Sequence, residues 1–304
     1  MEWEVRIIEW LQSHVDSFAI YLGRLLTFVG GEKGLMIVIL TVMFCWKKEV
    51  GKKVALILTA MSTWLTMIKA VVKRPRPYLQ YPDRVKMLAK VEVEAAADDV
   101  AAQGYSFPSM HSASVSLLYF TLAEFVKKKW TWILAVILTL FIAYSRVMVG
   151  AHYPTDVLAG LLIGFVSMAI YGLLVKIVKK EWLQNLILFL SALPGLIFVR
   201  TQDYYTSLGM LIALLGVIPF EEKYVNYQST DSIIAKILRV AGSLVVYFAL
   251  NSLLKLPFSS EFLDSGSFFS LIVRTIRYAI VMFVVLGVYP LIFPLYEKIG
   301  KGKK

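Results

Sequence analysis

Between two strongly apolar stretches, residues 145–156 form a polar interruption that contains Arg146, His152 and Asp156. Asp156 follows His152 by four residues, a spacing at which a carboxylate can accept a hydrogen bond from an imidazole N–H. That bond would fix the tautomer of His152 and leave its other ring nitrogen free as a nucleophile. Arg146 adds a planar, permanent cation suited to phosphate oxygens. The segment therefore predicts a nucleophilic histidine beside an anion clamp; the alternative is a helix boundary with a capping Asp and an interfacial Arg.

Two further segments carry residue types that suit the same chemistry. Residues 69–77 end an apolar run with four cations, and residues 105–111 open another apolar run. Pro108 suits the first turn of a helix, where backbone N–H groups attract anions and the Ser109 hydroxyl adds a donor. His111 would place a second imidazole over the same pocket. Two imidazoles can divide the nucleophile and general-acid roles, so the three segments together predict transfer of a phosphoryl group.

The sequence does not favour metal catalysis. No carboxylate cluster has the pattern of a two-metal site, and the spacings typical of zinc ligands are absent from the sequence. We therefore expect neither a catalytic metal nor a cofactor.

In chain order, the segments contain Lys-x6-Arg-Pro, Pro-Ser-x-His and Ser-Arg-x5-His-x3-Asp. This set resembles the three-part signature of the type-2 phosphatidic acid phosphatase superfamily, over roughly residues 20–180. The resemblance implies that His152 attacks phosphorus to form a phosphohistidine, that Asp156 orients it, and that His111 protonates the leaving oxygen. It also implies that the phosphoryl group is held by Lys69, Arg76, Ser109, Arg146 and the backbone amide after Ser109, which is that of Met110.

Met110 departs from the family pattern, because the family commonly has Gly at this position. A side chain there would narrow the pocket or limit how closely the backbone approaches the phosphate. The departure bears on the size of the substrate more than on the chemistry.

Composition places the chain in a membrane. Of its 304 residues, 58% are hydrophobic, and the mean hydropathy is +0.68. The formal net charge is +11, but the excess Lys and Arg lie largely in short loops. That distribution indicates membrane topology and anionic head groups as partners, and it argues against binding of nucleic acid.

Apolar runs predict an all-α, polytopic bundle of about nine transmembrane helices, or about ten if the N-terminal segment crosses. We expect residues 1–30 to be an amphipathic interfacial segment, 31–180 the phosphatase core, and 181–304 additional transmembrane helices of unknown role. The alanine-rich Glu94–Ala102 is predicted as either a short surface helix or a solvated connector. The runs are 34–46, 54–72, 106–126, 130–145, 157–175, 184–199, 207–220, 232–254 and 271–294.

Lysines mark alternate loops, and the positive-inside rule places those loops in the cytoplasm. All three motifs then face outward, from a bacterial or archaeal cytoplasmic membrane. A site at that interface favours a lipid substrate such as phosphatidic acid, phosphatidylglycerol phosphate or a polyprenyl diphosphate, and the motifs do not choose among the tails. The lysines are Lys47, Lys48, Lys52, Lys53, Lys127–Lys129, Lys176, Lys179, Lys180, Lys298, Lys301, Lys303 and Lys304.

Two other functions use the same residues. A lipid phosphotransferase would pass the phosphoryl group from the same phosphohistidine to a second lipid, and a lipid-phosphate transporter would use the cations without cleavage. A pure binding site has no need of two histidines with a carboxylate partner, which favours an enzyme. The sequence leaves the oligomeric state open and is compatible with a homo-oligomer.

Overall fold

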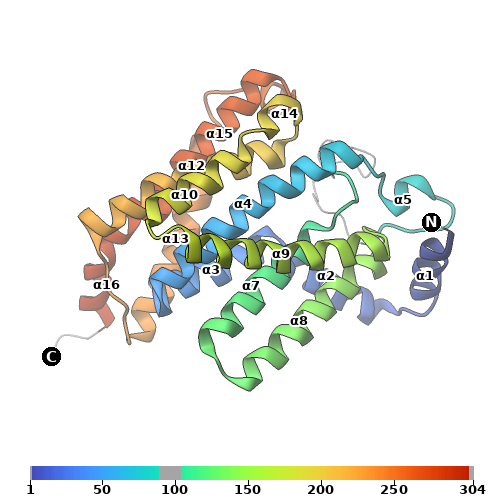
Figure 1. Cartoon of the computed structure of the whole chain (residues 1–304), viewed down its shortest axis with the longest axis horizontal. Helices are drawn as coiled ribbons and strands as arrows, with labels where there is room; N and C mark the ends of the chain where they lie inside the picture. Colours follow the sequence, from blue (N-terminus) through green and yellow to red (C-terminus); the bar gives the residue numbers. More distant parts are fainter. Residues whose placement is uncertain (1, 89–103, 301–304) are drawn as a thin grey trace. The chain divides into compact units, whose positions relative to one another are not determined.

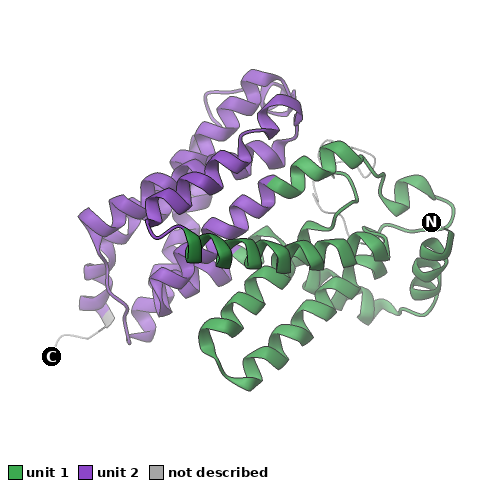
Figure 2. Ribbon diagram, in the orientation of Figure 1, with its two compact units in different colours: residues 1–35, 64–177 green, residues 36–63, 178–304 purple. Residues whose placement is uncertain are grey.

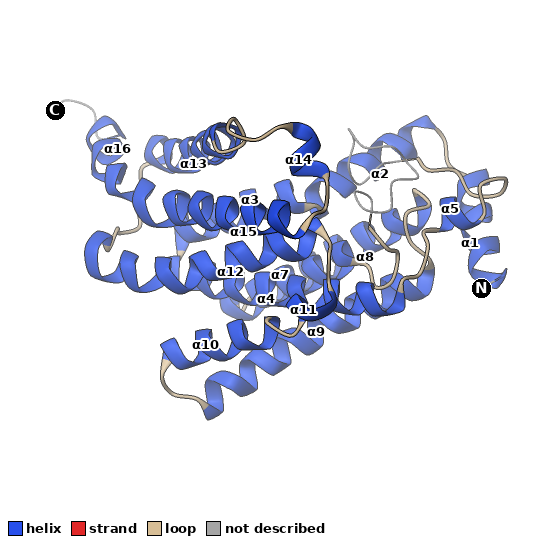
Figure 3. Cartoon of the chain, turned by 90° about the horizontal axis from the view of Figure 1, so that it is seen from above, coloured by secondary structure: helices blue, strands red, loops and turns tan. Residues whose placement is uncertain are grey.

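The protein consists of helices joined by loops in a computed structural model that describes residues 2–88 and 104–300 (Figures 1 and 3). No strand occurs in the described ranges, which confirms the all-α prediction. The segment Glu94–Ala102, with its two predicted alternatives, lies outside the described residues.

The chain divides into two compact units (Figure 2). Unit 1 comprises residues 1–35 and 64–177, and unit 2 comprises residues 36–63 and 178–304. This division differs from the predicted segments, because residues 36–63 group with the C-terminal helices. All three motifs fall within unit 1.

Unit 1 brings the motif-bearing helices together. Helix α7 packs against both α8 and α9. A Cβ at Gly160 would lie 2.4 Å from the carbonyl oxygen of Ser109, so the small residue lets α9 approach the start of α7. The helices of the unit are α1 (Glu2–Ser13), α2 (Ser17–Gly30), the second part of α4 (Lys48–Val72), α5 (Pro77–Gln80), α7 (Met110–Val126), α8 (Lys129–Met148) and α9 (Pro154–Ile177).

The predicted interfacial segment 1–30 contains two separate helices. In α1, Val5 and Ile8 are fully buried, while Trp3 and Trp10 are 53% and 61% exposed, as expected of an amphipathic helix. Val5 and Ile8 pack in one apolar cluster with Tyr153. Helix α1 is therefore seated on the segment that contains His152.

Unit 2 holds the remaining helices. Gly209 allows α12 and α15 to touch, because a Cβ there would lie 2.3 Å from the carbonyl oxygen of Thr275. The helical segment 181–198 is interrupted between α10 and α11, at Pro194 and Gly195. The helices are most of α3 (Glu32–Thr41), η1 (Val42–Trp46), the first part of α4, α10 (Glu181–Ala192), α11 (Gly195–Phe198), α12 (Gln202–Phe220), η2 (Glu221–Val225), α13 (Ile233–Leu253), α14 (Ser260–Asp264), α15 (Phe268–Phe283), η3 (Val284–Val288), η4 (Tyr289–Ile292) and α16 (Phe293–Gly300).

Long apolar helices identify an integral membrane protein. The described residues contain seven helices long and apolar enough to cross a bilayer, and up to eight with a bent pair of helices. That pair joins α2 to α3 (Glu32–Thr41) and η1 at an angle of 53°. Helix α7, with 17 residues, is about 26 Å long at 1.5 Å per residue, close to the minimum for a span. These helices account for the nine predicted apolar runs.

Candidate active site

Main-chain hydrogen bonds join the three motifs in unit 1. The N–H of Ser106 donates to the carbonyl of Arg74 at 2.8 Å, and the N–H of Ser109 donates to the carbonyl of Asp156 at 2.9 Å. The N–H of His152 donates to the carbonyl of Arg146 at 3.2 Å. The site is thus fixed by backbone geometry at the ends of four helices: α4, α7, α8 and α9.

His152 has a different environment at each ring nitrogen. Its Nε2 lies 3.4 Å from Nη1 of Arg76, and its Nδ1 lies 3.5 Å from the hydroxyl of Ser106 and 3.7 Å from Oδ2 of Asp156. The side chain is 2% exposed. Burial, followed by the positive charges of Arg76, Lys69 and Arg146, holds the pKa of His152 well below its usual value, so the ring is neutral at neutral pH.

Asp156 does not make the direct hydrogen bond to His152 that the four-residue spacing predicts. Its Oδ2 accepts instead from the hydroxyl of Ser106 at 2.5 Å and from the N–H of Tyr153 at 2.9 Å. The carboxylate therefore closes the first turn of α9, and the Ser106 hydroxyl contacts both the carboxylate and the imidazole. The sequence analysis did not single out Ser106, although it lies within the predicted segment 105–111.

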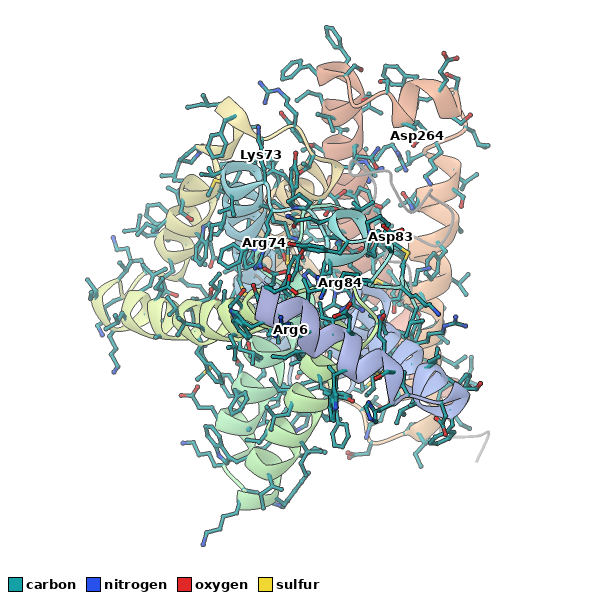
Figure 4. All side chains as sticks on the ribbon, turned by 90° about the vertical axis from the view of Figure 1, so that its right-hand side faces the viewer. Arg6, Lys73, Arg74, Asp83, Arg84 and Asp264 are labelled. Atoms are coloured by element: carbon teal, nitrogen blue, oxygen red, sulfur yellow. The ribbon has the colours of Figure 1, made fainter. Side chains whose placement is uncertain are left out.

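Arg74 occupies the far side of this carboxylate. Its Nη1 donates to Oδ1 of Asp156 at 2.6 Å, and its Nη2 donates to Oε2 of Glu4 at 2.7 Å. The guanidinium also lies 3.9 Å from the ring centroid of Tyr153. The sequence grouped Arg74 with the cations of the phosphate motif, whereas the structure turns it toward two carboxylates; Figure 4, seen from the α1 side, labels it near this helix.

Glu4 reaches this network from α1. It is 3% exposed, and its Oε1 accepts from the hydroxyl of Thr155 at 2.6 Å. Glu4, Arg74 and Asp156 form a chain of alternating charge behind His152, in which both carboxylates are buried and Arg74 is partly buried. Nothing in the local sequence signals this role, because Glu4 and Arg74 are 70 residues apart.

The predicted phosphate cations lie on the other side of His152. Arg76 donates from Nε to the carbonyl of Gly104 at 2.9 Å and from Nη1 to that of Ala151 at 3.0 Å, and Lys69 donates to the carbonyl of Tyr105. These bonds hold the loops around the site while both cations remain beside His152.

Arg146 differs from these two cations because it is fully buried and mostly unpaired. Its Nη1 donates to the hydroxyl of Thr27 on α2 at 2.7 Å. Within the described part of the chain, its Nε and Nη2 have no hydrogen-bond partner. Buried donors normally have partners, so these two suit an anion that binds there.

Ser109, Met110 and His111 open helix α7. Ser109 is the N-cap residue, and its Oγ accepts from the Ser112 hydroxyl at 3.0 Å, which leaves its own proton free to donate. Met110 is the first helical residue, so its N–H has no intrahelical acceptor. His111 interacts electrostatically with Arg146 and His152. The structure therefore brings all eight predicted site residues into one region of unit 1.

Helices α1 and α2 also support the loop before His152. Gln12 donates to the carbonyls of Lys86 and Met148 at 2.8 and 3.1 Å. Gly150 has φ +77°, and a Cβ there would lie 2.5 Å from the Lys86 carbonyl oxygen, so this position requires glycine. Sequence reasoning assigned the first two helices to the interface and missed their contribution to the site.

Two family models match the chain, and together they cover parts of both units. The family model of the PAP2 superfamily matches residues 51–181, which include all three motifs. The model of the PAP2 superfamily phosphatase, transmembrane extension, matches residues 205–299. No solved structure matches the chain.

Curated relatives match over short stretches. An undecaprenyl-diphosphatase of Sulfolobus acidocaldarius is 48% identical over 60 residues, which cover 20% of this chain and 29% of the relative. A lipid A 4'-phosphatase of Bacteroides thetaiotaomicron is 40% identical over 62 residues, 20% of this chain and 27% of the relative. Phosphatidylglycerophosphatase B of Bacillus subtilis is 34% identical over 74 residues, 21% of this chain and 36% of the relative. The matches span well under half of the length of these relatives.

Proposed function

Because the chain belongs to the PAP2 superfamily, we propose that it is a phosphatase that hydrolyses the phosphate monoester or diphosphate of a membrane lipid. His152 is the nucleophile, and the reaction passes through a phosphohistidine. No metal takes part in the reaction.

The observation that carries the proposal is the asymmetry around His152. The ring is neutral, its Nδ1 faces Ser106 and Asp156, and its Nε2 faces Arg76. A proton on Nδ1 directed toward the carboxylate side leaves the Nε2 lone pair on the side of the cations, where a phosphate would bind. The two unpartnered donors of Arg146 supply further contacts for that phosphate.

The reaction has two steps. The lone pair of His152 Nε2 forms a bond to phosphorus while the bond from phosphorus to the leaving oxygen breaks, and His111 gives that oxygen a proton. Water then attacks phosphorus and gives a proton to His111, the N–P bond breaks, and inorganic phosphate leaves. Lys69, Arg76, Ser109, the Met110 amide and Arg146 stabilise the charge on the phosphoryl oxygens in both steps.

A lipid substrate fits a site at the ends of membrane helices, and the named relatives act on lipid phosphates or diphosphates. The lysine-rich loops assign the opposite ends of these helices to the cytoplasm, so the substrate's phosphate lies at the outward interface. Its tail stays in the bilayer.

The test is phosphate release by the purified protein in detergent with EDTA, on a polyprenyl diphosphate, phosphatidic acid and phosphatidylglycerol phosphate. We expect release from at least one lipid, loss of that release in His152→Ala, and normal release in His14→Ala. His14 is a matched control, because it is exposed and its Nδ1 contacts the carbonyl oxygen of Trp10 at 2.7 Å. Transfer of the phosphoryl group to a second lipid without release of phosphate would instead indicate a phosphotransferase.

A further inference from the structure

Unit 2 contains two cations within a helix apolar enough to cross a membrane, apart from those of the candidate active site. They are Arg274 and Arg277 on α15. Arg277 is 4% exposed, and its Nη2 donates to the side-chain oxygen of Asn251 at 2.8 Å. Its Nε has no hydrogen-bond partner in the described ranges. Charged side chains inside a membrane span are rare and mark functional sites by default.

Neutral groups surround Arg274 as well. Its Nη1 donates to the hydroxyl of Thr206 at 3.3 Å, and its Nη2 donates to the side-chain oxygen of Gln202. Among residues 2–88 and 104–300, no carboxylate lies within ion-pair distance of either guanidinium. The two positive charges, three residues apart on one helix, therefore have no carboxylate counterion among the described residues.

Other buried cations of the same unit are neutralised. Arg239, 2% exposed, lies 2.9 Å from Oε1 of Glu297, and Lys52, 3% exposed, lies 2.5 Å from Oε2 of Glu221. A buried charge is strongly unfavourable unless an opposite charge pairs with it. The contrast indicates that Arg274 and Arg277 take their counterion from outside the chain.

The two arginines lie at one end of the helices of unit 2. Arg274 and Arg277 are about 9 and 14 Å from the first residue of α15 along its axis. Their partners come from the first turns of α12 and the last turn of α13. Most lysines of this unit lie at or near the opposite helix ends, which the positive-inside rule assigns to the cytoplasm, and the exception is Lys255, just after α13. The arginine pair therefore faces the outward leaflet.

We propose that Arg274 and Arg277 bind the phosphate oxyanion of an anionic phospholipid in that leaflet. The guanidinium fork matches two phosphate oxygens, and the long Arg side chains reach from within the hydrocarbon toward head-group depth. Asn251, Gln202 and Thr206 hold the guanidinium groups in place. This site is separate from the residues assigned to catalysis, and the proposal does not depend on the phosphatase activity.

The test measures the melting temperature of the full-length protein in phosphatidylcholine nanodiscs and in nanodiscs that also contain phosphatidylglycerol. A lipid that binds only the folded protein raises the melting temperature. We expect phosphatidylglycerol to raise it for the wild type and not for Arg277→Met or Arg274→Met. Arg274 is only partly buried, so its variant remains informative if Arg277→Met does not fold.

Two control variants locate the effect. Arg200→Met removes an exposed arginine that donates to the carbonyls of Leu196 and Val199, and it should keep the full response. Arg146→Met removes a cation of the candidate active site and should also keep it. A response lost in Arg146→Met and kept in the α15 variants would place the lipid at the active site and overturn the proposal.

Inorganic phosphate added to phosphatidylcholine nanodiscs distinguishes the source of the oxyanion. Stabilisation by phosphatidylglycerol that is lost in the α15 variants, with no stabilisation by free phosphate that these variants lose, supports a lipid ligand; stabilisation by free phosphate that the α15 variants keep belongs to the candidate active site. Stabilisation by free phosphate alone, absent in the α15 variants, would contradict the lipid assignment. The same response to phosphatidylglycerol in Arg277→Met, Arg274→Met and wild type, or no response in any of them, would overturn the site itself.

Discussion

The two sides of His152 differ in whether their polar groups are already paired. Behind the ring, the side of Asp156, the carboxylates of Asp156 and Glu4 are both paired with the partly buried Arg74. In front of it, Arg146 keeps two buried donors without partners in the described structure. The comparison teaches that cations in neighbouring motifs are not equivalent: Arg74 stabilises the protein, and Arg146 is available for a ligand.

The largest expected effect comes from the side of His152 on which Arg146 has unpaired donors. Arg146→Met should lower kcat/KM by about 10²–10³-fold, because it removes donors to the phosphoryl oxygens in the transition state. Its stability should be unchanged or raised, because an unpaired buried charge is lost. Phosphate release and thermal unfolding of the same preparation measure both. Arg24→Met on α2 is the control, because Arg24 is exposed and donates to the carbonyl of Leu88 at 3.0 Å. Large destabilisation by Arg146→Met would contradict the assignment of its donors to a ligand.

Ser106→Ala tests the role of the other side of His152, where Asp156 lies. The hydroxyl contacts both the imidazole and the carboxylate, so its loss should lower kcat by about tenfold, the equivalent of one hydrogen bond of about 1.4 kcal/mol. KM should change little, because Ser106 does not face the phosphate. Ser116→Ala removes another buried hydroxyl on α7 and serves as the control. An effect on KM alone would contradict a positioning role.

Glu4→Gln tests whether α1 stabilises the site. The substitution leaves Arg74 with one carboxylate instead of two, and we expect a loss of about 1–3 kcal/mol in the free energy of unfolding. Activity at saturating substrate should fall only a few-fold. Glu9→Gln on the same helix is the matched control, because Glu9 pairs with the more exposed Arg84. Equal stability losses in the two variants, measured by denaturant unfolding, would argue against a special role for Glu4.

The smallest expected effect is a shift in the dependence of kcat/KM on pH. A neutral His152 is the reactive form, and its pKa lies below the usual value of about 6.5, so kcat/KM should fall only as pH drops well below that value. Removing the positive charge of Arg146 raises the pKa of His152. In Arg146→Met, the fall of kcat/KM on the acid side of the pH profile should therefore occur at higher pH than in the wild type. His152 binds a proton more tightly in the unfolded chain than in the folded protein. The free energy of unfolding should therefore decrease as the pH falls below the usual pKa of histidine. A fall of kcat/KM at lower pH in Arg146→Met than in the wild type would contradict the electrostatic account.

The sequence predicted the helices and the convergence of the motifs better than it predicted their internal bonds. Apolar runs and prolines mark helix ends, so the pattern of residues correctly places Lys69, Ser109 and Arg146 at such ends. The four-residue spacing correctly places Asp156 beside His152, with Oδ2 3.7 Å from Nδ1, but not the direct hydrogen bond, because the carboxylate closes its own helix turn and bonds Ser106. Glu4 and Thr27 could not be found, because their roles depend on where α1 and α2 dock, and no local pattern encodes that.

The central claim is that His152 carries the phosphoryl group during turnover, and trapping tests it most directly. The purified protein is mixed with a lipid substrate labelled in its terminal phosphate, quenched in alkali within one turnover, and digested to locate the label. The account predicts an alkali-stable, acid-labile label on the peptide that contains His152, absent from His152→Ala and retained in His14→Ala. Rapid phosphate release with no label on His152, or undiminished turnover by His152→Ala, would contradict it.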